Sequence, residues 1–259
     1  MSAGWSDFPW RLIRPRPLPP AMNLALDEVL TRRVGAGERQ PTLRFWGWTE
    51  PVVVLGRFQS VVNEVDEEAA ARGGVTVVRR MTGGGAMFTE PENHITYSVY
   101  APPELVEGMG TVESYAFLDD WVVEALRSLG IDAWYEPIND LTSAEGKIGG
   151  AAQARRPGAV LHHTMTSYEM DAAKMLEVLR IGLEKITDKA IESAEKRVGP
   201  LSRQTELPRG EILERLIGTF RDRVGGNLAE DDLTKEELSA AEELARTKYG
   251  TEEWLRSIP

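Results

Sequence analysis

Two glycine-rich segments carry the residue types that can bind an anionic ligand. The first, residues 79–88, has three consecutive glycines soon after a pair of arginines. The second, residues 146–153, reads GKIGGAAQ and has Lys147 as its one cation. Because glycine has no Cβ, the amide N–H groups of such backbone can approach a phosphate or a carboxylate together with a nearby cation. We therefore expect both segments to line one site for a small anionic molecule.

The first segment matches neither of the common nucleotide-binding motifs. It lacks the GxxxxGK[ST] spacing of the P-loop, and its GGG run is not the GxGxxG of dinucleotide-binding folds. A flexible turn is the simpler interpretation of three glycines after a strand. Arg79 and Arg80 favour backbone packed against a ligand instead: one arginine, on the face that Thr82 shares, would reach a carboxylate or phosphate, and the other would form a structural ion pair.

The second segment combines a lysine with small neighbours. A lone lysine is usually a solvated surface charge, but here Lys147 stands beside backbone with little side-chain cover. A lysine is a compact charge suited to a phosphate oxygen or to negative charge that accumulates in a transition state. Just upstream, Asn139 and Asp140 either cap a turn or, with Asp140 as the ligand, recruit Mg²⁺ beside a nucleotide.

Composition limits the classes of function. The 259 residues are 42% hydrophobic and 27% charged, which fits one large domain or two small ones with a substantial core. A formal net charge of -11 argues against a general nucleic-acid binder. The absence of cysteine excludes disulfides, thiolate metal sites and cysteine nucleophiles, and it favours a cytoplasmic location. We expect no membrane partner, because there is neither a run of about 18 apolar residues nor a signal-peptide pattern.

The elements that must position these segments do not follow a regular βαβ rhythm. We expect strands at 10–13, 41–48, 52–56, 75–78, 93–100, 132–135, 147–153 and 159–166, and helices at 21–34, 63–72 and 114–129, the last capped by Ser114. From residue 171 onward the chain reads as largely helical, and Thr234 with Glu237 has capping-box spacing. The pattern predicts an α+β fold with a mixed, mostly antiparallel sheet and packed helices. We treat residues 1–259 as a single catalytic domain, with a sheet-rich core over 1–170 and a mainly helical part over 171–259.

Taken together, the segments resemble the lipoate–protein ligase family, within the wider biotin/lipoate ligase superfamily. The resemblance runs in order through MNLALDE at 22–28, LRFWGW at 43–48, LGRFQ at 55–59, RRMTGGGA at 79–86, IND at 138–140, GKIGGAAQ at 146–153, LHH at 161–163 and KYGTEEW at 248–254. Each match is weak alone, but their order and number make the combination specific.

The resemblance implies the ligase-like fold and an ATP-dependent activity in two steps. Lipoate and MgATP give lipoyl-adenylate, and a lysine of a lipoyl-type acceptor domain then attacks the mixed anhydride. Lys147 matches the family's essential lysine, which holds the carboxylate and the α-phosphate together and stabilises charge in both steps. The matching lipoate and adenylate cradle comprises Arg80, Thr82, Gly83, Gly84, Gly85, Ala86, Met87, Phe88, Gly149, Gly150 and Ala151. Asn139 and Asp140 match the nucleotide and metal side, with Mg²⁺ at Asp140, and His163 matches a histidine near the same pocket.

Some positions depart from the family pattern. The family usually has His-Asp where Thr89 and Glu90 stand, glycine where Thr164 stands, and often serine or asparagine where Gly149 and Ala151 stand. The chain ends soon after the KYGTEEW match, as in members without a C-terminal accessory domain. The resemblance therefore implies either a separate small accessory subunit or a subgroup that needs none.

Two alternatives to the ligase remain open. One is an octanoyl or lipoyl transferase of the same fold that takes octanoate from an acyl carrier protein without ATP. The other is a non-catalytic lipoate-binding protein. The missing cysteine, and GGG where cysteine transferases tend to carry GGR, favour the ligase, and the intact Lys147 argues against a pure binder. Biotin ligation is a weaker alternative, because the usual glycine and arginine alternation is missing.

Overall fold

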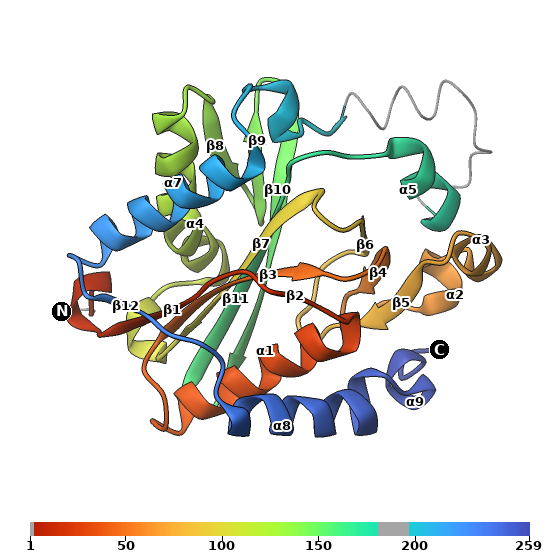
Figure 1. The fold of residues 1–259 in the computed structure, drawn as a ribbon, viewed down its shortest axis with the longest axis horizontal. Helices are drawn as coiled ribbons and strands as arrows, with labels where there is room; N and C mark the ends of the chain where they lie inside the picture. The colour runs from red at the N-terminus through yellow and green to blue at the C-terminus, as the bar shows by residue number, and fades with distance from the viewer. Residues whose placement is uncertain (1–2, 181–196) are drawn as a thin grey trace.

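The computed structural model describes residues 3–180 and 197–259, and two sheets organise them (Figure 1). The large sheet has the order β12-β1-β3-β7-β11-β10-β9-β8, with β2 paired to β3, and the small sheet has the order β5-β4-β6. The strands are β1 Trp10–Ile13, β2 Pro17–Leu18, β3 Thr42–Trp48, β4 Val52–Leu55, β5 Thr76–Arg79, β6 Met87–Thr89, β7 His94–Ala101, β8 Ala133–Glu136, β9 Asp140–Ser143, β10 Gly146–Arg156, β11 Ala159–Ser167 and β12 Leu228–Glu230. Residues 181–196, part of the region expected to be helical, lie outside the described residues.

The helices are α1 Pro20–Gly35, α2 Val61–Glu64, α3 Glu67–Arg72, α4 Thr111–Ser128, α5 Ala172–Val178, α7 Arg209–Arg223, α8 Lys235–Leu244 and α9 Glu252–Leu255. Short 3-10 turns lie at Trp5–Asp7, Pro103–Val106 and Leu201–Arg203, and a π-helical turn, η4, spans Ala245–Tyr249.

Strand pairing confirms the predicted α+β fold. From β3 through β7, β11, β10 and β9 to β8 every neighbouring pair is antiparallel, whereas β1 pairs in parallel with both β3 and β12. In the small sheet β4 is parallel to β5 and antiparallel to β6. The first glycine segment connects β5 to β6, and the second begins β10 in the large sheet.

Two predicted helices differ in detail from the structure. The helix expected at 63–72 is two short helices, because the chain is extended at Val65 and the Asp66 carboxylate accepts the Ala69 N–H to start α3. Ser114 does not cap α4. The helix starts at Thr111, where the Glu113 carboxylate accepts the Gly110 N–H, and Ser114 is buried inside it.

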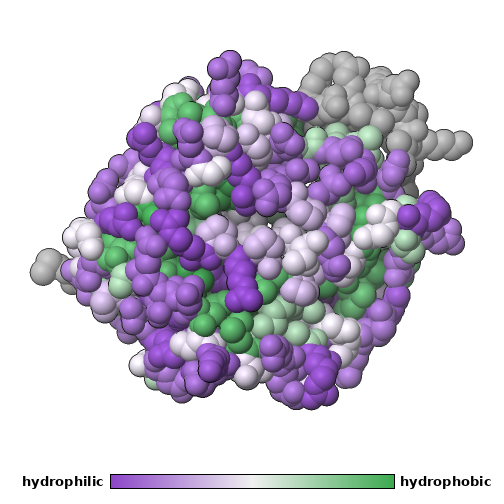
Figure 2. Space-filling view, in the orientation of Figure 1, coloured by the Kyte–Doolittle hydropathy of each residue, from purple (hydrophilic) through white to green (hydrophobic). Residues whose placement is uncertain are grey.

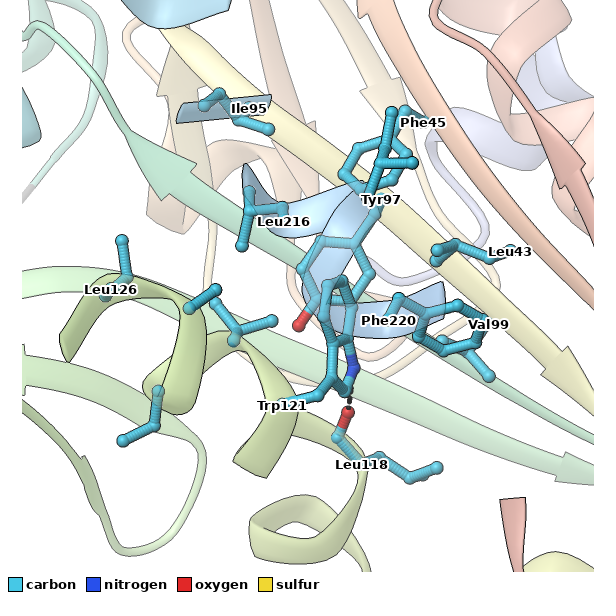
Figure 3. Packing of buried hydrophobic residues seen from close by; sticks show 14 of the residues in the cluster. Leu43, Phe45, Ile95, Tyr97, Val99, Leu118, Trp121, Leu126, Leu216 and Phe220 are labelled. Carbon is cyan, nitrogen blue, oxygen red and sulfur yellow. Dashed lines mark hydrogen bonds between the residues drawn. The ribbon is translucent and has the colours of Figure 1, made fainter. Parts of the chain in front are cut away.

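Helices α4 and α7 cover one face of the large sheet around an aromatic cluster (Figure 3). Trp121 of α4 lies with ring centroids 4.9 Å from Tyr97 of β7 and 5.1 Å from Phe220 of α7. Edge-on contacts of this kind are the favoured packing of aromatic rings. Leu118, Trp121, Val122, Ala125 and Leu126 recur at helical spacing and lie on the buried face of α4.

Helices α1 and α8 lie on the other side of the large sheet, and the C-terminal segment packs against α1 (Figure 1). Glu28 of α1 accepts hydrogen bonds from Lys248 Nζ at 2.6 Å and from Tyr249 Oη at 2.5 Å. The predicted capping box starts α8: Thr234 Oγ1 accepts the Glu237 N–H and Glu237 Oε2 accepts the Thr234 N–H. The two bonds to Glu28 attach the C-terminal part of the chain to α1, the helix that carries the MNLALDE motif.

Hydrophilic residues cover most of the face seen in Figure 2, with hydrophobic patches of limited extent between them. Within the described ranges no helix combines the length and the apolar character that a bilayer span requires.

Candidate active site

A cavity of about 1000 Å³ lies where the small sheet meets the large one, and both glycine segments line it. From the first segment the lining includes Arg80, Gly85, Ala86, Met87 and Phe88, and from the second Lys147, Gly149, Gly150 and Ala151, with Asn139 and His163 nearby in the wall. Thr82, Gly83, Gly84 and Asp140 lie outside this lining. The volume is at the upper end of the range for small-molecule sites. The expectation that the two segments share one site therefore agrees with their placement.

Arg80 uses its guanidinium to shape the first glycine loop. Nη2 donates to the carbonyl oxygens of Gly83 at 2.6 Å and Gly85 at 2.9 Å, Nη1 donates to Val54 O, and Nε donates to Thr82 Oγ1 at 3.0 Å. Burial lowers the pKa of Arg80 to about 10, which leaves the group charged at neutral pH. The arginine expected to point at the ligand therefore makes most of its contacts to the loop itself.

Arg79 is structural, as expected of one of the two arginines, but its partners are carbonyls rather than a carboxylate. Its Nη1 donates to Gly56 O and Gln59 O, and both Nε and Nη2 donate to Leu255 O. Arg79 thus joins the end of β5 to the turn after β4 and to the C-terminal helix α9.

Glycine is required at particular points of this loop and of the turn after β4 that packs against it. Gly84 has φ +87°, a conformation that side chains rarely adopt, and a Cβ on Gly56 would overlap the Gly84 carbonyl oxygen. A Cβ on Gly85, by contrast, would meet no atom of the described chain within 4 Å beyond its immediate chain neighbours. Gly85 is one of the residues that line the cavity, so there is room for a ligand against its backbone.

Lys147 stands at the start of β10, where it pairs with Thr142 of β9 just before a β-bulge that shifts the register at Gly149. Its Nζ lies 2.8 Å from Asp140 Oδ1, and the two side chains are 47% and 32% exposed. A Cβ on Gly150 would come within 3.3 Å of Nζ, so the glycine leaves room for the lysine across the strand. Gly149 has another reason to be glycine, because its Cβ would overlap the Met165 carbonyl oxygen of β11.

Asn139 secures the neighbouring strands at the same wall. Its Nδ2 donates to Ala151 O at 2.6 Å, and its own carbonyl accepts the Ala151 N–H at 2.8 Å. Across residues 3–180 and 197–259 there is no cluster of three or more potential metal-ligating side chains. A single carboxylate at Asp140 fits Mg²⁺ held mainly by ligand phosphates and water, which is the usual way this ion is bound beside nucleotides.

His163 reaches the cavity wall from β11, and its neighbour His162 points to the opposite face, as strand alternation predicts. His163 Nε2 lies 2.7 Å from Thr82 Oγ1, and Nδ1 lies 2.8 Å from Asp27 Oδ2. His162 instead contacts Asp119 of α4 at 2.8 Å. Asp27 was missed as a site residue: it stands in the MNLALDE motif, but nothing in the sequence connects it with a histidine 136 positions away.

The positions that depart from the family pattern have partners of their own. Thr89 Oγ1 lies 2.5 Å from His94 Nδ1, and Glu90 pairs with Lys174 at 2.7 Å. The Thr164 hydroxyl donates to Asp119 Oδ1 at 2.8 Å. Burial, with the charge of Arg209, lowers the pKa of His94 to about 3, so this side chain is neutral.

Much of the remaining wall is apolar. Four of the chain's eight methionines line it, namely Met87, Met165, Met170 and Met175. Trp46, Trp48 and Leu24 add to the same surface. Methionine is flexible and polarisable, and such a wall can adapt to a long apolar chain. The site thus places a cation and glycine backbone beside an apolar surface, the arrangement that an acyl group with a charged end requires.

Comparisons with known proteins agree with this chemistry. The family model described as the lipoyl protein ligase A/B catalytic domain matches residues 19–221. The chain is similar to an octanoyltransferase LipM of Geobacillus kaustophilus, with 32% identity over 95% of this chain and 97% of the relative. Among solved structures it is similar to a bipartite lipoate protein ligase of Thermoplasma acidophilum, with a TM-score of 0.85, 32% identity and 96% of each chain covered. A lipoate-protein ligase A bound with ATP has a TM-score of 0.83 and 30% identity, over 96% of this chain and 99% of that one.

Proposed function

Because the chain belongs to the lipoyl protein ligase A/B catalytic-domain family, we propose that it attaches a lipoyl or octanoyl group to a lysine of a lipoyl-type acceptor domain. The observation that carries the proposal is the placement of Lys147 at the wall of the cavity that the first glycine loop also lines. This arrangement can hold an activated acyl group and stabilise the charge that forms when an amine attacks it.

One form of the proposal is an ATP-dependent ligase. The acid's carboxylate attacks the α-phosphorus of ATP, pyrophosphate leaves, and the acceptor amine then displaces AMP from the mixed anhydride. Lys147 exchanges its contact with Asp140 for the carboxylate and phosphate oxygens, and it stays beside them in both steps. Asp140, released from the lysine, would hold Mg²⁺, which neutralises phosphate charge when bound. The ATP-bound structure of a similar ligase supports this form.

A second form is favoured by the relatives named octanoyltransferase. Here the acceptor amine attacks the thioester of an octanoylated carrier protein, the C–S bond breaks, and the carrier thiol leaves with the proton. Since the chain has no cysteine, this transfer cannot pass through a cysteinyl acyl-enzyme. Lys147 would stabilise the tetrahedral oxyanion in a single direct displacement.

One experiment separates the two forms. The purified chain is given an acceptor domain and either lipoate or octanoate with MgATP, or an octanoylated carrier protein without ATP. Pyrophosphate release that depends on the acid, with a matching mass increase of the acceptor, supports the ligase. Acylation from the carrier protein alone supports the transferase. A parallel arm adds a separate accessory ligase subunit, as the bipartite T. acidophilum enzyme suggests. The absence of both activities in both arms would contradict the proposed function.

A further inference from the structure

A chain of buried hydrogen bonds runs from helix α1 to the first glycine loop. It links Asp27 to His163 at 2.8 Å, His163 to Thr82 at 2.7 Å, and Thr82 to Arg80 at 3.0 Å. All four side chains are buried. This series of hydrogen bonds crosses from the large sheet to the loop of the small sheet, so it connects the two walls of the cavity.

The donors and acceptors along this chain have one consistent direction. Asp27 accepts from Tyr100 Oη at 2.5 Å and Ser98 Oγ at 3.0 Å, and Arg44 lies 3.7 Å away. Burial would raise the pKa of Asp27, but the hydrogen bonds from His163 and Tyr100 and the charge of Arg44 bring it below its ordinary value, so Asp27 is a carboxylate.

For His163 burial has the opposite effect. It outweighs the contribution of Asp27 and lowers the pKa of His163, so the imidazole is neutral. The Nδ1–H therefore donates to Asp27, and Nε2 is left as an acceptor. Thr82 has a single hydroxyl hydrogen, which it donates to His163 Nε2, while its oxygen accepts the Nε–H of Arg80.

Arg80, the last residue in this series of hydrogen bonds, orients the loop. Arg80 Nη2 holds the carbonyl oxygens of both Gly83 and Gly85. These peptides are trans, and a trans peptide directs its N–H opposite to its C=O. The amides of Gly84 and Ala86 are therefore turned away from the guanidinium. Fixing Arg80 fixes the directions in which the loop presents its N–H groups.

Hydroxyl, imidazole and carboxylate in this order also match the arrangement of a nucleophilic triad. Thr82 is only 1% exposed and lies outside the cavity lining, and its oxygen already accepts from Arg80. The hydroxyl is not presented to an acyl carbon. The geometry fits a Thr82 hydroxyl that holds the Arg80 guanidinium and the His163 imidazole in place.

We propose that Asp27, His163 and Thr82 are positioning residues, which set the orientation of Arg80 and through it the peptide groups of the first glycine loop that contact the reacting acyl group. The acyl transfer that these residues serve rests on the proposed function. The hydrogen-bond relay from Asp27 through His163 and Thr82 to Arg80 does not depend on it. Binding of the acid depends mainly on the apolar wall, so loss of the relay acts on turnover more than on affinity.

The test compares Thr82→Val, which has the same shape without the hydroxyl, with Thr82→Ser, which keeps it. In the acyl-attachment assay we expect kcat to fall about tenfold or more in Thr82→Val, with KM for the acid changed by less than about threefold. Thr82→Ser should retain kcat within about threefold of the wild type. Equal losses in both variants, or full activity in Thr82→Val, would overturn the proposal.

A second measurement needs no substrate. The chain has three histidines, so selective ¹⁵N labelling gives a simple imidazole spectrum, in which the His163→Asn variant assigns the His163 signals. We expect neutral His163 with the proton on Nδ1 at pH 7, and a shift of the Nε2 resonance in Thr82→Val but not in Thr82→Ser. A proton on Nε2, or an unshifted resonance in Thr82→Val, would refute the relay. A wild-type protein that shows this spectrum but has no acyl-attachment activity would instead contradict the proposed function alone.

Discussion

The two glycine segments carry the cations Arg79, Arg80 and Lys147, and the partners of these side chains set their roles. Arg79 and Arg80 donate to backbone carbonyls that no ligand can replace without moving the loop. Lys147 contacts the half-exposed carboxylate of Asp140. A surface pair of this kind contributes little to stability and exchanges readily. We infer that an incoming anion competes with Asp140 for Lys147 and leaves the arginines in place.

Replacing Lys147 with alanine tests this assignment. We expect Lys147→Ala to keep its melting temperature, because the side chain is half exposed, and to lose about 100-fold to 1,000-fold in acyl-attachment rate. Lys174→Ala is the matched control, since Lys174 is an exposed lysine with a single carboxylate partner, Glu90. Wild-type turnover in Lys147→Ala would contradict the electrostatic role proposed for this residue.

His94 predicts how stability depends on pH. Its folded-state pKa of about 3 lies below the ordinary value of 6.5, so the unfolded chain binds the proton more readily and the folded state is destabilised as pH falls through 6.5. Between pH 7 and pH 5 we expect the free energy of unfolding to fall by roughly 1 to 2 kcal/mol from this group. His163 acts in the same direction.

Urea unfolding at several pH values measures this effect. His94→Asn, which keeps a donor for Thr89 but does not titrate, should show a shallower loss between pH 7 and pH 5. The buried carboxylates with lowered pKa, those of Asp27, Glu28 and Glu237, reduce the stability of the protein only at lower pH, so the change between pH 7 and pH 5 comes from the histidines. Identical slopes in the two proteins would show that His94 is not the titrating group.

At the scale of elements, glycines of two kinds shape the first glycine loop: Gly56 lies in the turn after β4 that packs against the loop, and Gly85 lies in the loop itself. Gly56→Ala should destabilise the protein and displace the loop, because the new methyl meets the Gly84 carbonyl. Gly85→Ala should leave the melting temperature unchanged, because its methyl enters open space, but it should weaken binding of the acyl substrate. Calorimetric melting and titration with lipoate check both variants. Full lipoate affinity in Gly85→Ala would place the ligand elsewhere in the cavity.

Long, strongly patterned elements were predictable from the sequence. The strands expected at 93–100 and 159–166, the helix expected at 114–129 and the capping box of Thr234 with Glu237 correspond to β7, β11, α4 and the start of α8. The strands β2, β6, β9 and β12 were missed, since two to four residues carry no measurable period and their partners lie elsewhere in the chain.

The candidate site was predictable to a similar degree. Glycine runs beside cations identified both segments that line the cavity. The division of labour between Arg79 and Arg80 was not predictable, because it depends on carbonyls brought near by the fold, including that of Leu255 at the opposite end of the chain. The same holds for Asp27, which meets His163 only after α1 has packed on the sheet.

At the scale of the whole molecule, the C-terminal segment braces the small sheet. The C-terminal helix α9 lies beside β5 (Figure 1). Leu255 O accepts from Arg79, and Trp254 Nε1 donates to Arg79 O at 2.8 Å. Removing residues 251–259 leaves a buried arginine without these partners. We expect this truncation to cost about 2 to 4 kcal/mol of unfolding free energy and to reduce activity through the loop.

A shorter truncation is the control. Removal of 257–259 keeps both Trp254 and Leu255, so the unfolding midpoint in urea should change little. Equal stability of the two truncated proteins would show that the bonds to Arg79 do not brace the sheet.

The methionine-lined wall determines how this protein responds to oxidants. A cysteine-free chain has no thiolate to be captured by the disulfide of a lipoyl ring, so thiol-blocking reagents should leave its activity intact. The thioethers at Met87, Met165, Met170 and Met175 are its oxidisable sulfur atoms in the cavity. Conversion to sulfoxides would make the apolar surface polar and expel the acyl chain, and methionine sulfoxide reductases would restore it. Oxidative damage at these methionines would therefore be reversible, and it would reduce acyl-chain binding if this wall holds the acyl chain as proposed.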